Sequence, residues 1–289
     1  MASLRVSLSL DTRRTTKRFR SRAAFEMETN ELPSREYTDD GRRLYRFDPE
    51  RAYPGTTTVT STIAKPQLDG WKLREEQREL IKVAGRCYRE ELQTARKETR
   101  APQNSTDFQK RIKDEIGGRF LSDAARDRGG QIGTDAHQLF EWKLRRRMGQ
   151  TVLEEPVVSD KVLWASMAFD DWVQKTKPEP IAVEAIVWSD RFRYAGTLDL
   201  ACKINGELIL VDFKTGSKIT TEALLQSVAY QQAWREMGHP PFVGGLIVRL
   251  PKKTSDPEYE EKVVPAFDEL WPVFEAALTL DRFLYGEKA

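Results

Sequence analysis

The sequence predicts an α/β protein with a small mixed central β-sheet flanked by helices, preceded by a helical N-terminal region. From residue 133 onward the hydrophobic pattern reads helix, helix, three strands, helix, strand, helix. That order typically builds a sheet covered by helices. The dipeptide Asn205-Gly206 lies between two strand-like runs, where it indicates a tight hairpin turn. We expect the mostly helical region before residue 130 to pack on this core.

Helices are predicted where apolar residues recur three and four positions apart. Two such stretches precede the core, and the pair Gly129-Gly130 is expected to break the second of them. From residue 133 onward, further helices are predicted before, between and after the strands. The predicted helices cover about 72–98, 107–127, 133–148, 158–176, 220–237 and 265–284.

Strands are predicted where short apolar runs are bounded by turn residues. Three of them precede the helix at 220–237, and one follows it. The segments Tyr45–Phe47 and Thr56–Ser61, on either side of Pro54-Gly55, are expected to be short strand or loop pieces. The four strands of the core are predicted at Val183–Trp188, Arg193–Lys203, Glu207–Phe213 and Val243–Leu250.

The N-terminus is polar and irregular, and residues 1–44 are expected to form a flexible basic tail. Its first 22 residues hold seven arginines and lysines against one acid, Asp11. This composition loosely resembles an organelle transit peptide. We expect residues 45–289 to form a single domain. Its parts are a helical part at 72–130, a catalytic core at 131–250 and a C-terminal helix at 265–284.

Composition bears on nucleic-acid binding, disulfide content and membrane insertion. The net charge of the 289 residues is only +2, so local patches must carry any argument for nucleic-acid binding. The two cysteines, Cys87 and Cys202, argue against a disulfide framework and fit a reducing compartment. No apolar run approaches the roughly 18 residues of a membrane span. We therefore expect a cytoplasmic protein, with a mitochondrial location as the minority alternative.

Two acids and a lysine end apolar strands near the middle of the chain. Strand alternation puts Asp212 and Lys214 on one face, and a hairpin brings Asp199 beside Asp212 if the register allows. Adjacent carboxylates repel each other unless one is protonated or a cation bridges them. A divalent cation suits carboxylate oxygens. The alternative is a buried Asp–Lys ion pair without catalytic function.

Other polar residues extend this set, each with an ordinary structural alternative. Glu184 lies in the preceding strand, where the residue by itself slightly favours an exposed carboxylate over a site residue. His137 shares a helix face with Glu141, and an imidazole can bind Mn²⁺, although a single histidine is more often structural. Gln226 and Tyr230 lie one helical turn apart. They either contact the substrate or Lys214, or pack at a helix edge.

Several short motifs occur in a recognisable order. They are Gly133-Thr with His137, Gly196-Thr-Leu-Asp199, Asp212-Phe-Lys-Thr-Gly216 and Gln226 with Tyr230. In this order and spacing the chain resembles the PD-(D/E)XK nuclease superfamily, and within it the RecB-like exonucleases. The segment Tyr53–Thr60 followed by Trp71 is similar to the N-terminal segment of phage and mitochondrial single-strand exonucleases of this group.

The resemblance implies a restriction-endonuclease-like core and a function for each motif residue. Lys214 is then the catalytic lysine, and Gln226 and Tyr230 complete the last motif. One or two Mg²⁺ or Mn²⁺ ions are implied. Two cysteines cannot supply the four-cysteine iron–sulfur cluster of some relatives, so no such cluster is expected. The implied metal ligands are His137, Glu184, Asp199, Asp212 and the Phe213 carbonyl.

The function expected from the resemblance is metal-dependent hydrolysis of DNA by an exonuclease. It would act at ends with single-stranded character, in replication, recombination or repair, with a recombination or single-strand-binding protein as a partner. The alternatives are a structure-specific endonuclease or nickase, and a DNA-end-binding recombination module without activity. Five arginines are expected to bind the DNA backbone or simply to form a solvated surface. They are Arg145, Arg146, Arg147, Arg191 and Arg193.

Overall fold

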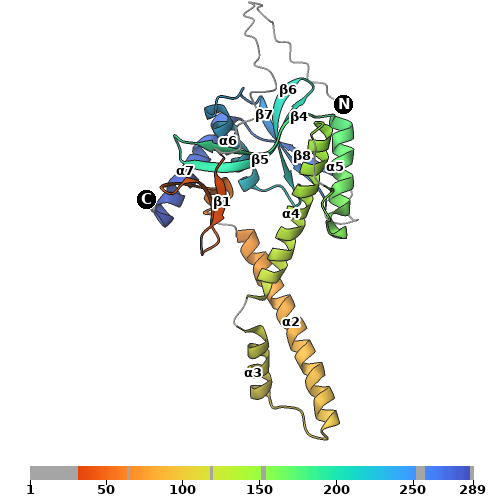
Figure 1. Ribbon diagram of the computed structural model, residues 1–289. Helices are drawn as coiled ribbons and strands as arrows, with labels where there is room; N and C mark the ends of the chain where they lie inside the picture. The colour runs from red at the N-terminus through yellow and green to blue at the C-terminus, as the bar shows by residue number, and fades with distance from the viewer. Residues whose placement is uncertain (1–31, 64–65, 118–119, 151–153, 252–257, 287–289) are drawn as a thin grey trace, which may run out of the picture.

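A five-stranded mixed sheet lies at the centre of the protein (Figure 1). The computed structural model describes residues 32–63, 66–117, 120–150, 154–251 and 258–286. The strand order is β4-β5-β6-β7-β8, and only β6 and β7 run parallel. The strands are β4 (Glu179–Ser189), β5 (Tyr194–Ile204), β6 (Glu207–Lys214), β7 (Gly244–Arg249) and β8 (Glu260–Val263).

The predicted α/β class and its four strands are confirmed. Asn205 and Gly206 both have positive φ values, of 53° and 85°, as a two-residue hairpin turn between antiparallel strands requires. The parallel pair β6–β7 needs a crossover connection, which α6 (Thr221–Glu236) provides. The edge strand β8 was not predicted, because its sequence is short, charged and exposed throughout.

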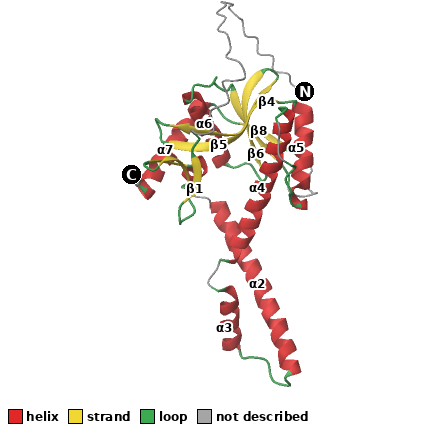
Figure 2. Ribbon diagram, viewed as in Figure 1, coloured by secondary structure: helices red, strands yellow, loops and turns green. Residues whose placement is uncertain are grey.

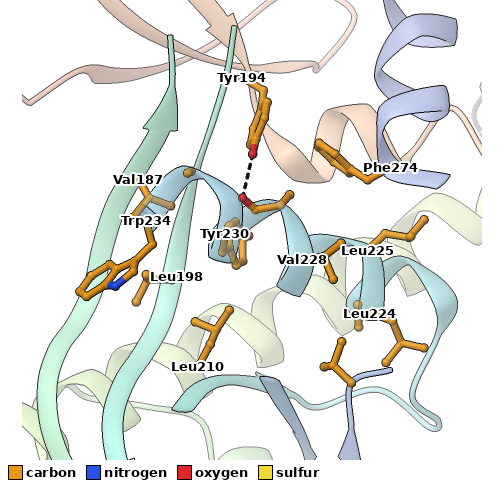
Figure 3. Close-up of a cluster of buried hydrophobic side chains, with 14 of the residues drawn as sticks. Val187, Tyr194, Leu198, Leu210, Leu224, Leu225, Val228, Tyr230, Trp234 and Phe274 are labelled. Carbon is orange, nitrogen blue, oxygen red and sulfur yellow. Dashed lines mark hydrogen bonds between the residues drawn. The ribbon is translucent and has the colours of Figure 1, made fainter. Parts of the chain in front are cut away.

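Helices cover both faces of this sheet (Figure 1). On one face α6 and α7 (Phe267–Tyr285) pack on a core that includes Leu198, Leu210 and Trp234 (Figure 3). Within it the Tyr194 hydroxyl donates to the Ala229 carbonyl at 2.8 Å. On the other face lie α4 (Leu121–Arg147), the 3-10 turn η2 (Asp160–Val162) and α5 (Leu163–Thr176).

The N-terminal part of the described chain forms a second, smaller sheet. Its strands β1 (Ser34–Tyr37), β2 (Arg43–Asp48) and β3 (Arg51–Pro54) pair in order. The predicted tail is therefore wrong for residues 34–44, which are largely in strands or their connecting turn, while residues 1–31 lie outside the described ranges. Residues 56–60 form a short helix, α1 (Thr56–Thr60), instead of the expected strand or loop. Packing of α1 against the main core overrides the β preference of its threonines.

The helix pair α2 (Pro66–Lys97) and α3 (Ser105–Ile116) projects from the body as an arm (Figure 2). Gly129-Gly130 lies inside α4 and does not end it, so the prediction of a break there is wrong. Glu76 of α2 accepts hydrogen bonds from the backbone N–H groups of Leu121 and Ser122 at 3.0 and 2.8 Å. This cap and the packing on α2 offset the helix cost of two glycines, about 1 kcal/mol each. In the described ranges, no helix has the length and apolar character needed to cross a bilayer.

An ion pair joins the small sheet to the C-terminal helix. The Arg42 guanidinium donates to both carboxylate oxygens of Asp281 at 2.9 Å and stacks 3.7 Å from the centre of the Tyr285 ring. The Asp281 side chain is only 4% exposed. Removing the arginine would leave a buried carboxylate without its cation, which is strongly unfavourable.

We expect Arg42→Ala to lower the free energy of unfolding by about 3 kcal/mol for this reason. The matched control is Arg46→Ala, because Arg46 pairs with Glu36 at a site where both side chains are more than a third exposed. Such pairs contribute about 0.5 kcal/mol. Urea unfolding of the two variants measures the difference, and equal losses would contradict a stabilising role specific to the Arg42–Asp281 pair.

Candidate active site

The central sheet opens into a fork between β5 and β6. The β5–β6 ladder ends at the pair Leu200–Val211. Beyond it, β5 continues with β4 alone and β6 continues with β7 alone. Asp199 and Asp212 are the next residues on each side of this opening, and the Phe213 N–H donates to Asp199 Oδ2 at 2.7 Å. The two predicted acids therefore lie at the point where the strands separate.

At Glu184 the regular alternation of side chains along β4 is interrupted. Glu184 has a φ of +48°, which is rare for a residue with a side chain. Val183 and its partner Leu200 pack toward α4 and α5, whereas Ala185 and its partner Leu198 pack toward α6. Regular alternation would keep each such set on one face. Glu184 thus lies where the side chains of both β4 and β5 change from one face of the sheet to the other. Its left-handed backbone conformation costs roughly 1–3 kcal/mol.

His137 reaches this opening from α4. Its Nδ1 lies 3.6 Å from Glu184 Oε1 and 3.5 Å from Asp199 Oδ1. Ligand atoms of the three residues all lie within 4.8 Å of one another. These residues come from one helix and two strands, and the sequence analysis selected all three. Their arrangement is suited to sharing one cation.

Asp212 and Lys214 form a close pair beside this group. Lys214 Nζ lies 2.8 Å from Asp212 Oδ1 and 2.7 Å from Oδ2. The Asp212 side chain is 2% exposed, and its buried Oδ2 has no hydrogen bond among the described residues beyond this ion-pair contact with the lysine ammonium. Such an oxygen keeps lone-pair capacity that a metal ion can use. Carboxylates with one imidazole are ligands that Mg²⁺ or Mn²⁺ accepts, so these residues fit a divalent ion.

The charges of this cluster depend strongly on one another. Burial raises the pKa of Asp212 to about 6 and also raises that of Glu184. Burial is the largest effect on Asp199 and acts in the same direction, but the charge and hydrogen bond of His137, the charge of Lys214 and the Phe213 N–H together lower the pKa of this carboxyl. Burial is also the largest effect on His137 and disfavours its charged form, yet Asp199 and Glu184 together raise the pKa of the imidazole to about 10. The acids thus require compensating positive charge, which a proton or a metal ion can provide.

The two predicted residues of α6 approach the fork from the opposite face. The Thr56 hydroxyl donates to the Tyr230 hydroxyl at 3.0 Å, and Gln226 Nε2 donates to Thr60 Oγ1 at 3.3 Å. A Cβ at Gly196 would overlap the Tyr230 ring and lie 2.8 Å from Thr56 Oγ1. This close approach explains the glycine three residues before Asp199. The sequence analysis did not select the two threonines, since only a run of threonines marked them.

The five arginines predicted to bind DNA are not brought into this cluster. Arg145 donates to Glu141 at 2.8 Å and to the Val183 carbonyl at 3.2 Å. Arg146 stacks 4.6 Å from the Trp142 ring and, nine residues after His137, projects from the opposite side of α4. Arg147 is exposed at the end of this helix.

Arg191 and Arg193 lie in the turn between β4 and β5. The last strand pair before this turn, Ser189–Tyr194, is five strand positions from the Glu184–Asp199 level, about 17 Å at the rise of a strand. The Arg191 guanidinium stacks 4.8 Å from the Phe192 ring. DNA binding by these two arginines and by the three of α4 stays a prediction.

Comparison with known proteins identifies the family of this chain. A sequence model of the PD-(D/E)XK nuclease superfamily matches residues 119–283, more than half of the chain. The protein therefore belongs to the PD-(D/E)XK nuclease superfamily, and it is a metal-dependent nuclease that acts on DNA. A search of curated proteins found no match. The matched residues include α4 and most of α7, but not the small sheet, α1 or the arm.

The positive φ of Glu184 predicts that a glutamate at this position lowers the free energy of unfolding relative to glycine. We expect Glu184→Gly to stabilise the protein by about 1 kcal/mol, because glycine adopts positive φ without strain. The melting temperature should rise by roughly 2–4 °C. We also expect DNA cleavage to be lost with the carboxylate. Thermal unfolding and a cleavage assay on the same preparation measure both effects.

The control for Glu184→Gly is Glu179→Gly, at an exposed position of the same strand that lacks a positive φ. There glycine should destabilise by about 0.5–1 kcal/mol, because it has more freedom to lose on folding. If both variants lost stability equally, the backbone of Glu184 would carry no strain of the kind described.

Proposed function

We propose that this protein is a DNA exonuclease that hydrolyses phosphodiester bonds at ends with single-stranded character. The observation that carries the proposal is the meeting of His137, Glu184 and Asp199 with the Asp212–Lys214 pair at the fork of the sheet. An imidazole, three carboxylates and an ammonium group in one partly buried place match the requirements of metal-assisted phosphate chemistry.

Each residue of the cluster has a distinct proposed role. His137, Glu184, Asp199 and Asp212 hold one or two Mg²⁺ or Mn²⁺ ions, with the Phe213 carbonyl as a further ligand. The bound metal supplies Lewis-acid chemistry, lowering the pKa of a water and neutralising phosphate charge. Asp212 orients Lys214 by accepting its hydrogen bond.

Lys214 is proposed to stabilise the charge that develops on the phosphate. Burial, the largest single effect, lowers the pKa of Lys214, but the charges of Asp212, Asp199 and Glu184 and the hydrogen bond to Asp212 together raise it. The ammonium group is therefore charged at neutral pH. Gln226 and Tyr230, from the opposite face of the sheet, are proposed to complete the site.

The preference for ends rests on the N-terminal segment. Residues 53–60 and Trp71 resemble the corresponding segment of phage and mitochondrial single-strand exonucleases, and in this protein Thr56 contacts Tyr230 at the site. We propose a role in replication, recombination or repair, with a recombination or single-strand-binding protein as partner. The proposed compartment is the cytoplasm of a bacterium or phage-infected host, with the mitochondrion as the minority alternative. The five arginines of α4 and the β4–β5 turn are proposed to bind the DNA backbone.

Replacing the lysine tests the chemistry. We expect Lys214→Ala to reduce cleavage by at least about 100-fold, because the ammonium group stabilises charge only where it is held. Lys203→Ala, at an exposed position near the end of β5, should retain the wild-type rate. Cleavage by the wild type should cease in EDTA and return with excess Mg²⁺ or Mn²⁺. Full activity of Lys214→Ala with Mg²⁺ would remove the role assigned to this residue.

The form of the DNA tests the exonuclease assignment. End-labelled linear DNA, single- and double-stranded, should be degraded over time, with the single-stranded form degraded faster. Covalently closed circular DNA of the same sequence should stay intact, since it offers no end. Cleavage of the circle would instead indicate a structure-specific endonuclease or nickase. Binding of ends that is insensitive to EDTA, without degradation, would indicate a recombination module without activity.

A further inference from the structure

A segment outside the matched family region reaches the candidate active site. The small sheet and α1 precede residue 119, where the family match begins. Nevertheless, Gly55 bridges to Ala195 of β5, and Val59 is fully buried in the core that contains Leu198 and Tyr230. The side chains of this segment therefore contribute to the surroundings of the motif residues.

Thr56 makes the first of three polar contacts with the site. Its hydroxyl donates to the Tyr230 hydroxyl at 3.0 Å, and both side chains are buried. A phenol oxygen that accepts this hydrogen bond keeps its own proton for another acceptor. Asp212 lies close enough to Tyr230 for its charge to raise the pKa of the phenol further, after the larger effect of burial. Thr56 thus determines which way the Tyr230 hydroxyl can donate.

Thr60 makes the second contact, one helical turn after Thr56. Its hydroxyl donates to the Thr57 carbonyl at 3.2 Å, so its oxygen is left to accept from Gln226 Nε2 at 3.3 Å. This pairing defines the orientation of the Gln226 amide, with the nitrogen toward α1 and the carbonyl oxygen pointing away from it.

Tyr45 of β2 makes the third contact. Its hydroxyl lies 2.9 Å from Thr197 Oγ1, two residues before Asp199. Together the three contacts link the N-terminal segment to β5 and to α6. Thr58, in the same helix as Thr56 and Thr60, differs from them. Within the described part of the chain its hydroxyl bonds to the backbone N–H and carbonyl of Arg43, at 3.1 and 3.0 Å, and not to β5 or α6.

We propose that Thr56 and Thr60 are positioning residues that orient the Tyr230 hydroxyl and the Gln226 amide toward the DNA substrate. This inference rests on the proposed nuclease function, because it concerns the same site. The active site of this chain is then built from two parts of the sequence, the matched core and the side chains of Tyr45, Thr56 and Thr60. Small displacements of a positioned group cost large factors in rate, so losing one hydroxyl should affect turnover more than folding.

Three single variants test the first contact. Thr56→Val removes the hydroxyl at nearly constant shape and should lower kcat by at least about tenfold with KM changed less than about twofold. Thr56→Ser keeps the hydroxyl and should restore most of the rate. Thr58→Val removes a buried hydrogen bond of the same helix and should change stability in urea without changing kcat. Thr60→Val and Thr60→Ser repeat the comparison at the second contact.

A double-mutant cycle with Tyr230→Phe separates positioning from general damage. Tyr230→Phe keeps the ring that packs on Gly196 but lacks the hydroxyl that Thr56 orients. On this background Thr56→Val should cause no further loss of kcat, because the two changes remove one interaction.

Two results would overturn the inference. One is wild-type kcat in both threonine-to-valine variants, and the other is a loss in the double variant equal to the product of the single losses. Either result leaves the nuclease assignment intact. If the wild type itself failed to cleave any DNA in Mg²⁺ or Mn²⁺, the proposed function would fail instead.

Discussion

Electrostatic repulsion among buried carboxylates is the constraint on which the rest of this structure depends. Asp199, Asp212 and Glu184 lie at one opening of the sheet, where burial penalises each negative charge. His137 and Lys214 supply positive charge from α4 and β6. Among the described residues, Asp212 Oδ2 has only its ion-pair contact with Lys214. A cluster that is unfavourable for folding is therefore favourable for binding a divalent ion.

The fold accommodates these carboxylates where β5 and β6 stop pairing. β5 and β6 separate after Leu200 and Val211, and the α4 residue His137 and the α6 residue Tyr230 approach this opening from opposite faces. The reversal at Glu184 and the close packing on Gly196 both occur at this opening. Strain and unusual packing are concentrated where the chemistry is expected, a common arrangement in enzymes.

Much of the core was predictable because its signals are local. Alternation, the Asn205-Gly206 turn and the apolar helix patterns each depend on neighbouring residues, and they located four strands and the helices that cover them. Predictions failed where distant contacts outweighed local preference. Gly129-Gly130 stays helical because α2 caps and packs against α4. The threonine-rich α1 is helical because it is buried against the core, and the exposed, charged β8 carried little local signal.

The sequence by itself determined which residues could perform the chemistry. The acids at the ends of apolar strands, the lysine two positions after Asp212, and the histidine on a helix are all evident from the local sequence pattern. Only the tertiary structure decided how these groups meet. The fork in the sheet, the left-handed Glu184 and the contact of Thr56 with Tyr230 join segments far apart in the chain. No local pattern encodes such contacts, since they arise when separate elements pack together.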